Sequence, residues 1–138
     1  MSFQRILIAI DGGPIPAHAM KVGADLAKAL GAQIALVYVV DPKLASAPEG
    51  GYPPSVILDE FRQEGRELLI AASVRIGGGS PAQEYLPEGN PSQEIIKTAA
   101  EWNADLIVLG THGRSGISRM FLGSTAEGVV RHAQIPVL

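Results

Sequence analysis

Short apolar runs alternate along the chain with amphipathic stretches. Three strong runs rich in β-branched residues occupy residues 5–10 (RILIAI), 33–40 (QIALVYVV) and 105–110 (DLIVLG), and weaker candidates occupy residues 82–86 and 135–138. Because the strong runs are apolar on both faces, they predict central strands of a parallel sheet that helices cover on each side.

Helical patterns lie between these runs. Residues 16–30 and 55–76 carry apolar stripes, and Gly31 is suited to end the first of these helices. Further helices are predicted to begin at NPSQ, residues 90–93, with Asn90 as cap, and at STAE, residues 124–127, as a second capping box. Five strands alternating with four helices predict a single α/β domain over residues 1–138, an open, mostly parallel five-stranded sheet with helices on both faces.

Composition supports this fold class and narrows the range of partners. With 138 residues, 46% of them hydrophobic, the chain can bury a substantial core. A net charge of -3 without any basic run argues against nucleic acid as a partner. The absence of cysteine excludes disulfides and thiolate metal sites. The longest apolar run, residues 34–40, is far too short to span a membrane, and the first residues lack the hydrophobic region of a signal peptide, so a cytoplasmic protein is expected.

The carboxyl ends of the predicted strands bring three loops together. Open α/β sheets bind ligands outside these ends. In this chain the three strong predicted strands are followed by IDGGP, by VVDP and by the glycine-rich stretch GTHGRSGISRMFLGST, residues 110–125. The long segment from Asp41 to Pro54 is expected to fold over the same edge as a flap.

The glycine-rich stretch predicts an anion site. Its candidate residues are Gly110, Gly113, Gly123, Arg114, Ser124 and Thr125. Glycines let backbone N–H groups converge on an anion, and the following helix adds free amides and the positive end of its dipole. Loop glycines and a capping box are each explained by structure alone, but their conjunction with an arginine at a strand end favours a phosphate chain. No Gly-Lys pair exists, which excludes a Walker-type loop.

With these features the chain resembles the ATP-binding branch of the universal stress protein family. The resemblance rests on the pattern G-x2-G-x9-G-[ST] in the glycine-rich stretch and on ILIAIDGG, VYVVDP, GNPSQEII, ADLIVLGTHG and IPVL, which together cover nearly the whole chain. It implies a Rossmann-like, adenine-nucleotide α-hydrolase-like fold, a bound ATP or AMP with the need for magnesium left open, and a regulatory role in the stress response. It also implies a homodimer joined through the last strand. Relatives usually continue that strand beyond the position of Leu138, so less of it is expected to pair here.

The resemblance also implies roles for individual residues. Ala9, Ile10 and Asp11 would border the nucleoside, with Asp11 near the ribose or a phosphate-bound metal, and Val39 would meet adenine through its backbone. The ribose and phosphates would be surrounded by Gly110, Thr111, His112, Gly113, Arg114, Ser115 and Gly116, and the phosphate tail by Gly123, Ser124 and Thr125. Gly13 departs from the serine or threonine that is usual there, which predicts an altered loop rather than a lost fold.

Two other functional classes stay open. One is an ATP-using enzyme of the related adenine-nucleotide α/β group, and the other is an interaction module with a vestigial nucleotide site. Only Arg114 and Asp11 are plausible parts of a phosphoryl-transfer site, and nothing places His112 beside an activated hydroxyl, so slow hydrolysis at most is expected. Trp102 is interpreted as a packing residue, and Tyr38 is expected to face the sheet or the flap.

Overall fold

A parallel sheet with helices on both faces forms the centre of the computed structural model, which describes residues 3–10, 16–45, 51–77, 82–110 and 123–138. The strands are β1 (Arg5–Ile10), β2 (Gln33–Tyr38), β3 (Gln83–Tyr85) and β4 (Leu106–Val108). The helices are α1 (Pro16–Leu30), α2 (Pro42–Ala45), α3 (Pro54–Ile76), α4 (Pro91–Trp102) and α5 (Ser124–His132). None of the helices in the described residues is long and apolar enough to cross a membrane.

The strand order is β3-β2-β1-β4, and every pair is parallel. The α/β class and the open parallel sheet are therefore confirmed, but within the described residues the sheet has four strands instead of the five expected from the sequence. Residues 135–138 do not form the fifth strand. They lie beside β4 through one isolated parallel bridge, between Ile107 and Val137, with backbone hydrogen bonds on either side of it. Pro136 lacks an N–H group, which limits how far this short segment can extend the ladder.

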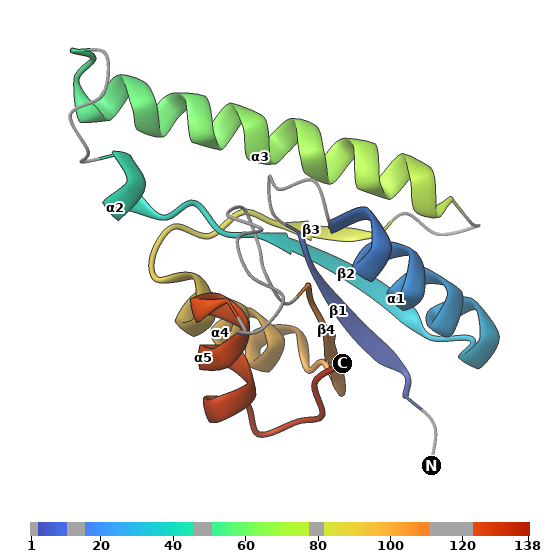
Figure 1. Ribbon diagram of the computed structural model, residues 1–138. Coiled ribbons are helices and arrows are strands. Elements are labelled where there is room, and N and C mark those ends of the chain that lie inside the picture. Colours follow the sequence, from blue (N-terminus) through green and yellow to red (C-terminus); the bar gives the residue numbers. More distant parts are fainter. Residues whose placement is uncertain (1–2, 11–15, 46–50, 78–81, 111–122) are drawn as a thin grey trace.

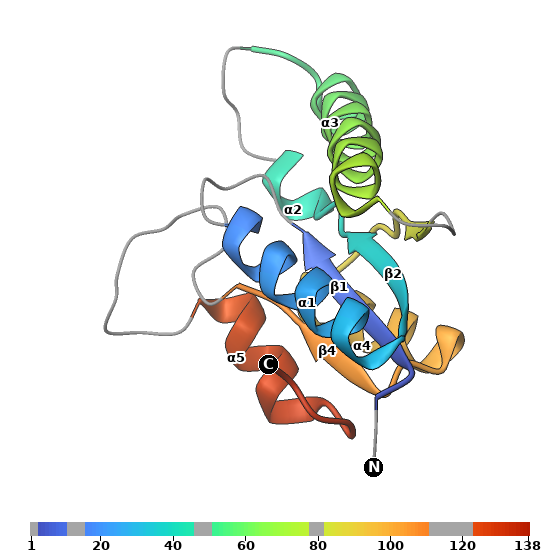
Figure 2. The ribbon, with the colours of Figure 1, turned by 90° about the vertical axis from the view of Figure 1, so that its right-hand side faces the viewer.

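Alternate strand residues point to opposite faces of the sheet, and each face has its own core. On one face, Ile6, Ile8 and Leu36 pack beneath α1 and α3. On the other, Leu7 and Val37 pack against Ile95, Trp102 and Val129 of α4 and α5. Figures 1 and 2 show the sheet between these two helical layers. The runs are apolar on both faces because both faces are covered.

Helix ends follow from local sequence signals. Gly31 adopts φ 67°, and Ala32 N–H donates to Ala27 C=O at 2.8 Å, which closes α1 as the sequence predicts. At the start of α4 the Asn90 side chain accepts a hydrogen bond from Gln93 N–H at 3.1 Å, which confirms Asn90 as the cap.

The segment expected to act as a flap contains helical structure at both ends. Residues 42–45 form α2 and α3 begins at Pro54, while residues 46–50 lie outside the described part of the chain. Asp41 caps α2, because its carboxylate accepts a hydrogen bond from Lys43 N–H at 3.0 Å.

Candidate functional site

The carboxyl ends of β1, β2 and β4 lie at one edge of the sheet. Ile10 at the end of β1 is in register with Tyr38 at the end of β2, and Ile8 is in register with Val108 of β4. The loops that follow β1, β2 and β4 therefore leave the sheet at the same edge, as the sequence predicts. Residues 11–15 and 111–122 lie outside the described residues.

Three partly exposed apolar side chains share one face at this edge. Ala9 and Val39, both predicted from the sequence, pack against the core beneath α4 and α5, and Leu109 joins them. Together they form an apolar wall at the carboxyl edge. Leu109 was not predicted, although the alternation of strand residues could have identified it, since Leu109 follows the same alternation as Ile107.

Ile10 points the other way. Its side chain is 9% exposed and belongs to the core beneath α1 and α3. Any contact that Ile10 makes with a ligand beside the apolar wall therefore has to come from its backbone.

The backbone of Val39 is directed toward β1. Gln33 N–H donates to Gln4 C=O on the β1 side, whereas Val40 N–H donates to Pro87 C=O on the β3 side. Backbone groups of successive residues in an extended strand point alternately to the two neighbours, so those of Val39 point to the same side as those of Gln33. Val39 thus presents main-chain polar groups next to its own apolar side chain, at the level where β1 ends.

Helix α5 begins at the same edge. The segment after α5 runs parallel to β4, so α5 has to run back from the carboxyl ends of the strands, and Figure 2 shows it opposed to β4. Its first amides have no partner within the helix, because the first turn of any helix leaves them free. The helix start therefore directs N–H donors and the positive end of a dipole toward this edge.

The cap of α5 differs from the prediction. Gly123 is the N-cap, with φ -63° and ψ 156°, and no side chain of the described residues makes a capping hydrogen bond there. Ser124 is the first helical residue instead of the cap, so the predicted capping box at residues 124–127 is wrong. A glycine at this position satisfies the cap geometry without a side-chain acceptor, which leaves the first amides to other partners.

The acidic residue in the first turn of α5 has its own partner. Glu127 Oε1 accepts a hydrogen bond from Arg131 Nη2 at 2.8 Å, one turn further along the helix. The ion pair reduces the repulsion that Glu127 would exert on an anion at the helix start.

Half of the predicted site residues fall within the described part of the chain. The structure places Ala9, Ile10, Val39, Gly110, Gly123, Ser124 and Thr125 on the strand ends and the helix start at this edge. Asp11, Thr111, His112, Gly113, Arg114, Ser115 and Gly116 lie outside the described residues. Among the residues that are described, no group of three or more His, Asp or Glu side chains is arranged to hold a metal ion.

Known proteins are similar to this chain in sequence and in fold. A universal stress protein of Methanocaldococcus jannaschii is 36% identical over 140 residues, which cover 99% of this chain and 81% of that protein. A universal stress protein solved in complex with cAMP is 25% identical with a TM-score of 0.75, and covers 100% of this chain and 97% of its own. The Archaeoglobus fulgidus protein solved in complex with dAMP is 27% identical with a TM-score of 0.70, covering 100% of this chain and 98% of its own.

A model of the whole family gives the same assignment. It matches residues 2–138, which include the strands, the helices and both flanks of the glycine-rich stretch. From the strand ends, the helix start and this match together, we conclude that the chain belongs to the universal stress protein family.

Proposed function

We propose that this protein binds an adenine nucleotide, ATP or AMP, at the carboxyl edge of its sheet and acts as a regulator in the stress response. The observation that carries the proposal is the pairing of an apolar wall with an uncapped helix start at one edge. Ala9, Val39 and Leu109 offer a surface for a flat base, and α5 offers amides for phosphate.

The proposed contacts follow the roles that the family resemblance implies for these residues. Adenine lies against the apolar wall and bonds to the backbone of Val39, and the nucleoside borders Ala9, Ile10 and Asp11. The ribose and phosphates contact Gly110 and residues 111–116. The phosphate tail meets the amides and hydroxyl groups at the start of α5, from Gly123, Ser124 and Thr125.

The relatives support the ligand class. The bound molecules in the two related structures are cAMP and dAMP, and each combines an adenine base with a phosphate group. An apolar wall beside main-chain donors and a helix start suits both parts of such a ligand.

We propose regulation instead of catalysis, with occupancy changing the conformation of the edge. In this proposal the nucleotide contacts the segments 41–54 and 110–125, so bound nucleotide is expected to slow hydrogen exchange in both. If saturating ATP or AMP left hydrogen exchange in both segments unchanged from the nucleotide-free protein, the regulatory part of the proposal would be wrong. Release of AMP or ADP stimulated by a second substrate would favour the related enzyme class instead.

Nucleotide binding is tested with Gly110→Ala. A Cβ built at Gly110 has no heavy atom of the described structure within 4 Å, so the fold should accept the methyl group. If the sugar and phosphates pass over this backbone, the added methyl group should weaken ATP and AMP binding by about tenfold or more, as expected when a packed contact is overfilled. Calorimetric titration with and without magnesium measures this. Equal affinity for the variant and the parent would show that the nucleotide does not pass over Gly110, and no binding by the parent would contradict the function.

We also propose a homodimer that forms through the last segment of the chain. Residues 136–138 lie beside β4 on one side, where Leu138 N–H donates to Ile107 C=O and Leu109 N–H donates to Leu138 C=O. The backbone groups of Val137 therefore point away from β4, toward the outer edge of the sheet. Light scattering of the purified protein tests this proposal by measuring the mass in solution.

A further inference from the structure

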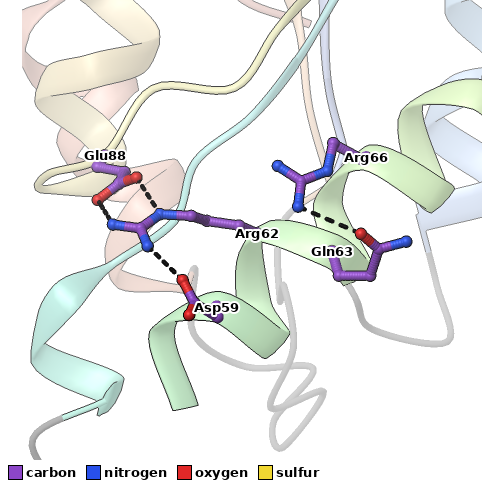
Figure 3. A network of polar contacts seen from close by, with 5 residues as sticks. All are labelled: Asp59, Arg62, Gln63, Arg66 and Glu88. Atoms are coloured by element: carbon purple, nitrogen blue, oxygen red, sulfur yellow. Dashed lines mark hydrogen bonds and ion pairs between the residues drawn. The ribbon is translucent and has the colours of Figure 1, made fainter. Parts of the chain in front are cut away.

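One arginine of α3 joins two carboxylates that are distant in sequence. Figure 3 shows the Arg62 guanidinium between Asp59 of the same helix and Glu88 of the segment after β3. Arg62 Nε donates to Glu88 Oε2 at 2.5 Å and Nη2 donates to Oε1 at 2.9 Å, while Nη1 donates to Asp59 Oδ1 at 2.7 Å. The contact with Glu88 is bidentate, a geometry that fixes direction as well as distance.

Glu88 belongs to a segment that continues the sheet beyond β3. Glu88 forms an isolated parallel bridge with Val40. Around this bridge, Val40 N–H donates to Pro87 C=O at 2.9 Å and Gly89 N–H donates to Val40 C=O at 3.0 Å. Arg62 therefore ties α3 to the segment 87–89, which is hydrogen-bonded to Val40.

Electrostatics favour the charged pair at neutral pH. The hydrogen bonds from Arg62 hold the pKa of the Glu88 carboxyl below its ordinary value. The side chains are 32% exposed for Arg62 and 37% exposed for Glu88, so water and salt screen the pair. Its effect on global stability should accordingly be small, and its effect on the position of the segment 87–89 is the more informative quantity.

Val39 lies directly beside this arrangement. The side chain of Val40 is 1% exposed and belongs to the core beneath α1 and α3, and its backbone is bonded to the segment 87–89. Because the side chain and the backbone of Val40 are both fixed, the neighbouring Val39 has to point its side chain to the opposite face and its backbone groups toward β1.

We infer that Arg62 is a positioning residue for base recognition. Arg62 holds Glu88 and with it the segment 87–89. That segment is hydrogen-bonded to Val40, and in this way Arg62 fixes the backbone of Val39. This inference rests on the proposed function, because it assigns a role to the backbone of Val39 in binding adenine. Arg62 itself does not touch the nucleotide.

The expected effect is modest and can be bounded. A nucleotide that binds one backbone arrangement loses affinity in proportion to the fraction of molecules that leave it. Partly exposed ion pairs shift such an equilibrium by a small factor, so loss of the pair should weaken binding by about three- to fivefold.

The experiment compares Arg62→Gln with Arg66→Gln in the full chain. Arg66 lies one turn further along α3 and donates to Gln63 of the same helix at 3.2 Å, so it gives the same loss of charge without a bond to Glu88 (Figure 3). Calorimetry measures ATP and AMP affinity. Amide exchange in the nucleotide-free protein, followed by NMR, measures the protection of Val40 and Gly89.

We expect Arg62→Gln to weaken binding by about three- to fivefold and to speed exchange at Val40 and Gly89, whereas Arg66→Gln changes neither. Glu88→Gln should reproduce the effect, and the double variant Arg62→Gln with Glu88→Gln should be no weaker than either single variant, since both remove one interaction. Arg62→Lys should restore only part of the affinity, because an ammonium group keeps the charge without the planar fork.

Three results would overturn the inference. Unchanged exchange at Val40 and Gly89 in Arg62→Gln would show that the pair does not hold the segment 87–89. Faster exchange with unchanged affinity would show that this segment does not position the base. An equal loss of affinity in Arg66→Gln would assign the effect to net charge. A parent protein that binds neither nucleotide would instead contradict the proposed function, which distinguishes the two failures.

Discussion

Single glycines decide how closely the helices approach the sheet. A Cβ at Gly65 of α3 would lie 2.6 Å from Tyr38 Cδ1 and 2.6 Å from Leu86 Cδ1. A Cβ at Gly23 of α1 would lie 2.8 Å from Ile8 Cδ1, the terminal methyl group of a flexible side chain. Both glycines allow close packing, but only the first faces the edge of an aromatic ring, which cannot turn aside as a methyl group can.

This contrast predicts different outcomes for the two alanine variants. Gly65→Ala should lower the free energy of unfolding by about 1–3 kcal/mol, because overpacking against the ring outweighs the gain of about 0.5–1 kcal/mol from a better helix former. In Gly23→Ala the two effects should nearly cancel, since rotation of the Ile8 side chain relieves the contact. Urea titration of both variants measures the difference. A Gly65→Ala protein as stable as the parent would mean that α3 can move away from Tyr38 at little cost.

At the scale of whole elements, the first turns of α4 and α5 differ in how their backbone amides are satisfied. Helix α4 has a side-chain cap in Asn90, whereas α5 begins after Gly123 with no side-chain cap and with Ser124 already inside the helix. A capped start satisfies its own amides. An uncapped start leaves them to another partner, which fits the proposed phosphate contact.

Asn90→Ala and Ser124→Ala are expected to differ in their effects on stability and on nucleotide binding. Asn90→Ala should cost about 1 kcal/mol of unfolding free energy, because the hydrogen bond to Gln93 N–H is lost. Ser124→Ala should change stability by no more than about 0.5 kcal/mol, as expected for a surface substitution away from a cap, but should weaken nucleotide binding. Thermal or urea unfolding and a nucleotide titration of each variant provide the measurements. A Ser124→Ala protein destabilised as strongly as Asn90→Ala would restore Ser124 as a cap.

The elements themselves were largely predictable from periodicity. The strand at residues 5–10 and the helix at residues 16–30 have the expected bounds, because long, strongly patterned segments carry their own signal. The last segment was overestimated, since residues 135–138 form a single bridge beside β4. Helix α2 was missed, although Asp41 followed by Pro42 is a recognised start signal for a helix.

The site was predictable only in part. The residues at the strand ends and the start of α5 follow from the order of elements along the chain, so the sequence alone is enough to assign Val39 and Thr125 to one edge. The pairing of Arg62 with Glu88 could not be predicted in this way, because they are 26 positions apart in the sequence and their meeting depends on how α3 crosses the sheet. Contacts between charged side chains carry no periodic pattern in the sequence.

At the scale of the whole molecule, the outer edge of the sheet is the feature that bears on assembly. Beside β4, residues 136–138 leave the backbone groups of Val137 directed outward, and the Leu138 side chain is 56% exposed. Among the described residues no strand pairs with this outer edge, and such an edge is a template for a second strand. Two copies of the chain that pair along this edge would continue the sheet from one protomer into the other.

We therefore expect a mass of about twice 14.5 kDa by light scattering, and a shift toward the monomer in Leu138→Lys. A lysine on an edge strand opposes pairing, because the two copies would bring like charges together. Val74→Lys is the matched control. Val74 is 75% exposed on α3, which covers one face of the sheet, whereas Val137 packs against the core on the opposite face. The control should keep the mass of the parent. A monomeric parent would contradict the dimer, and a Leu138→Lys protein that remains dimeric would place the interface on another surface.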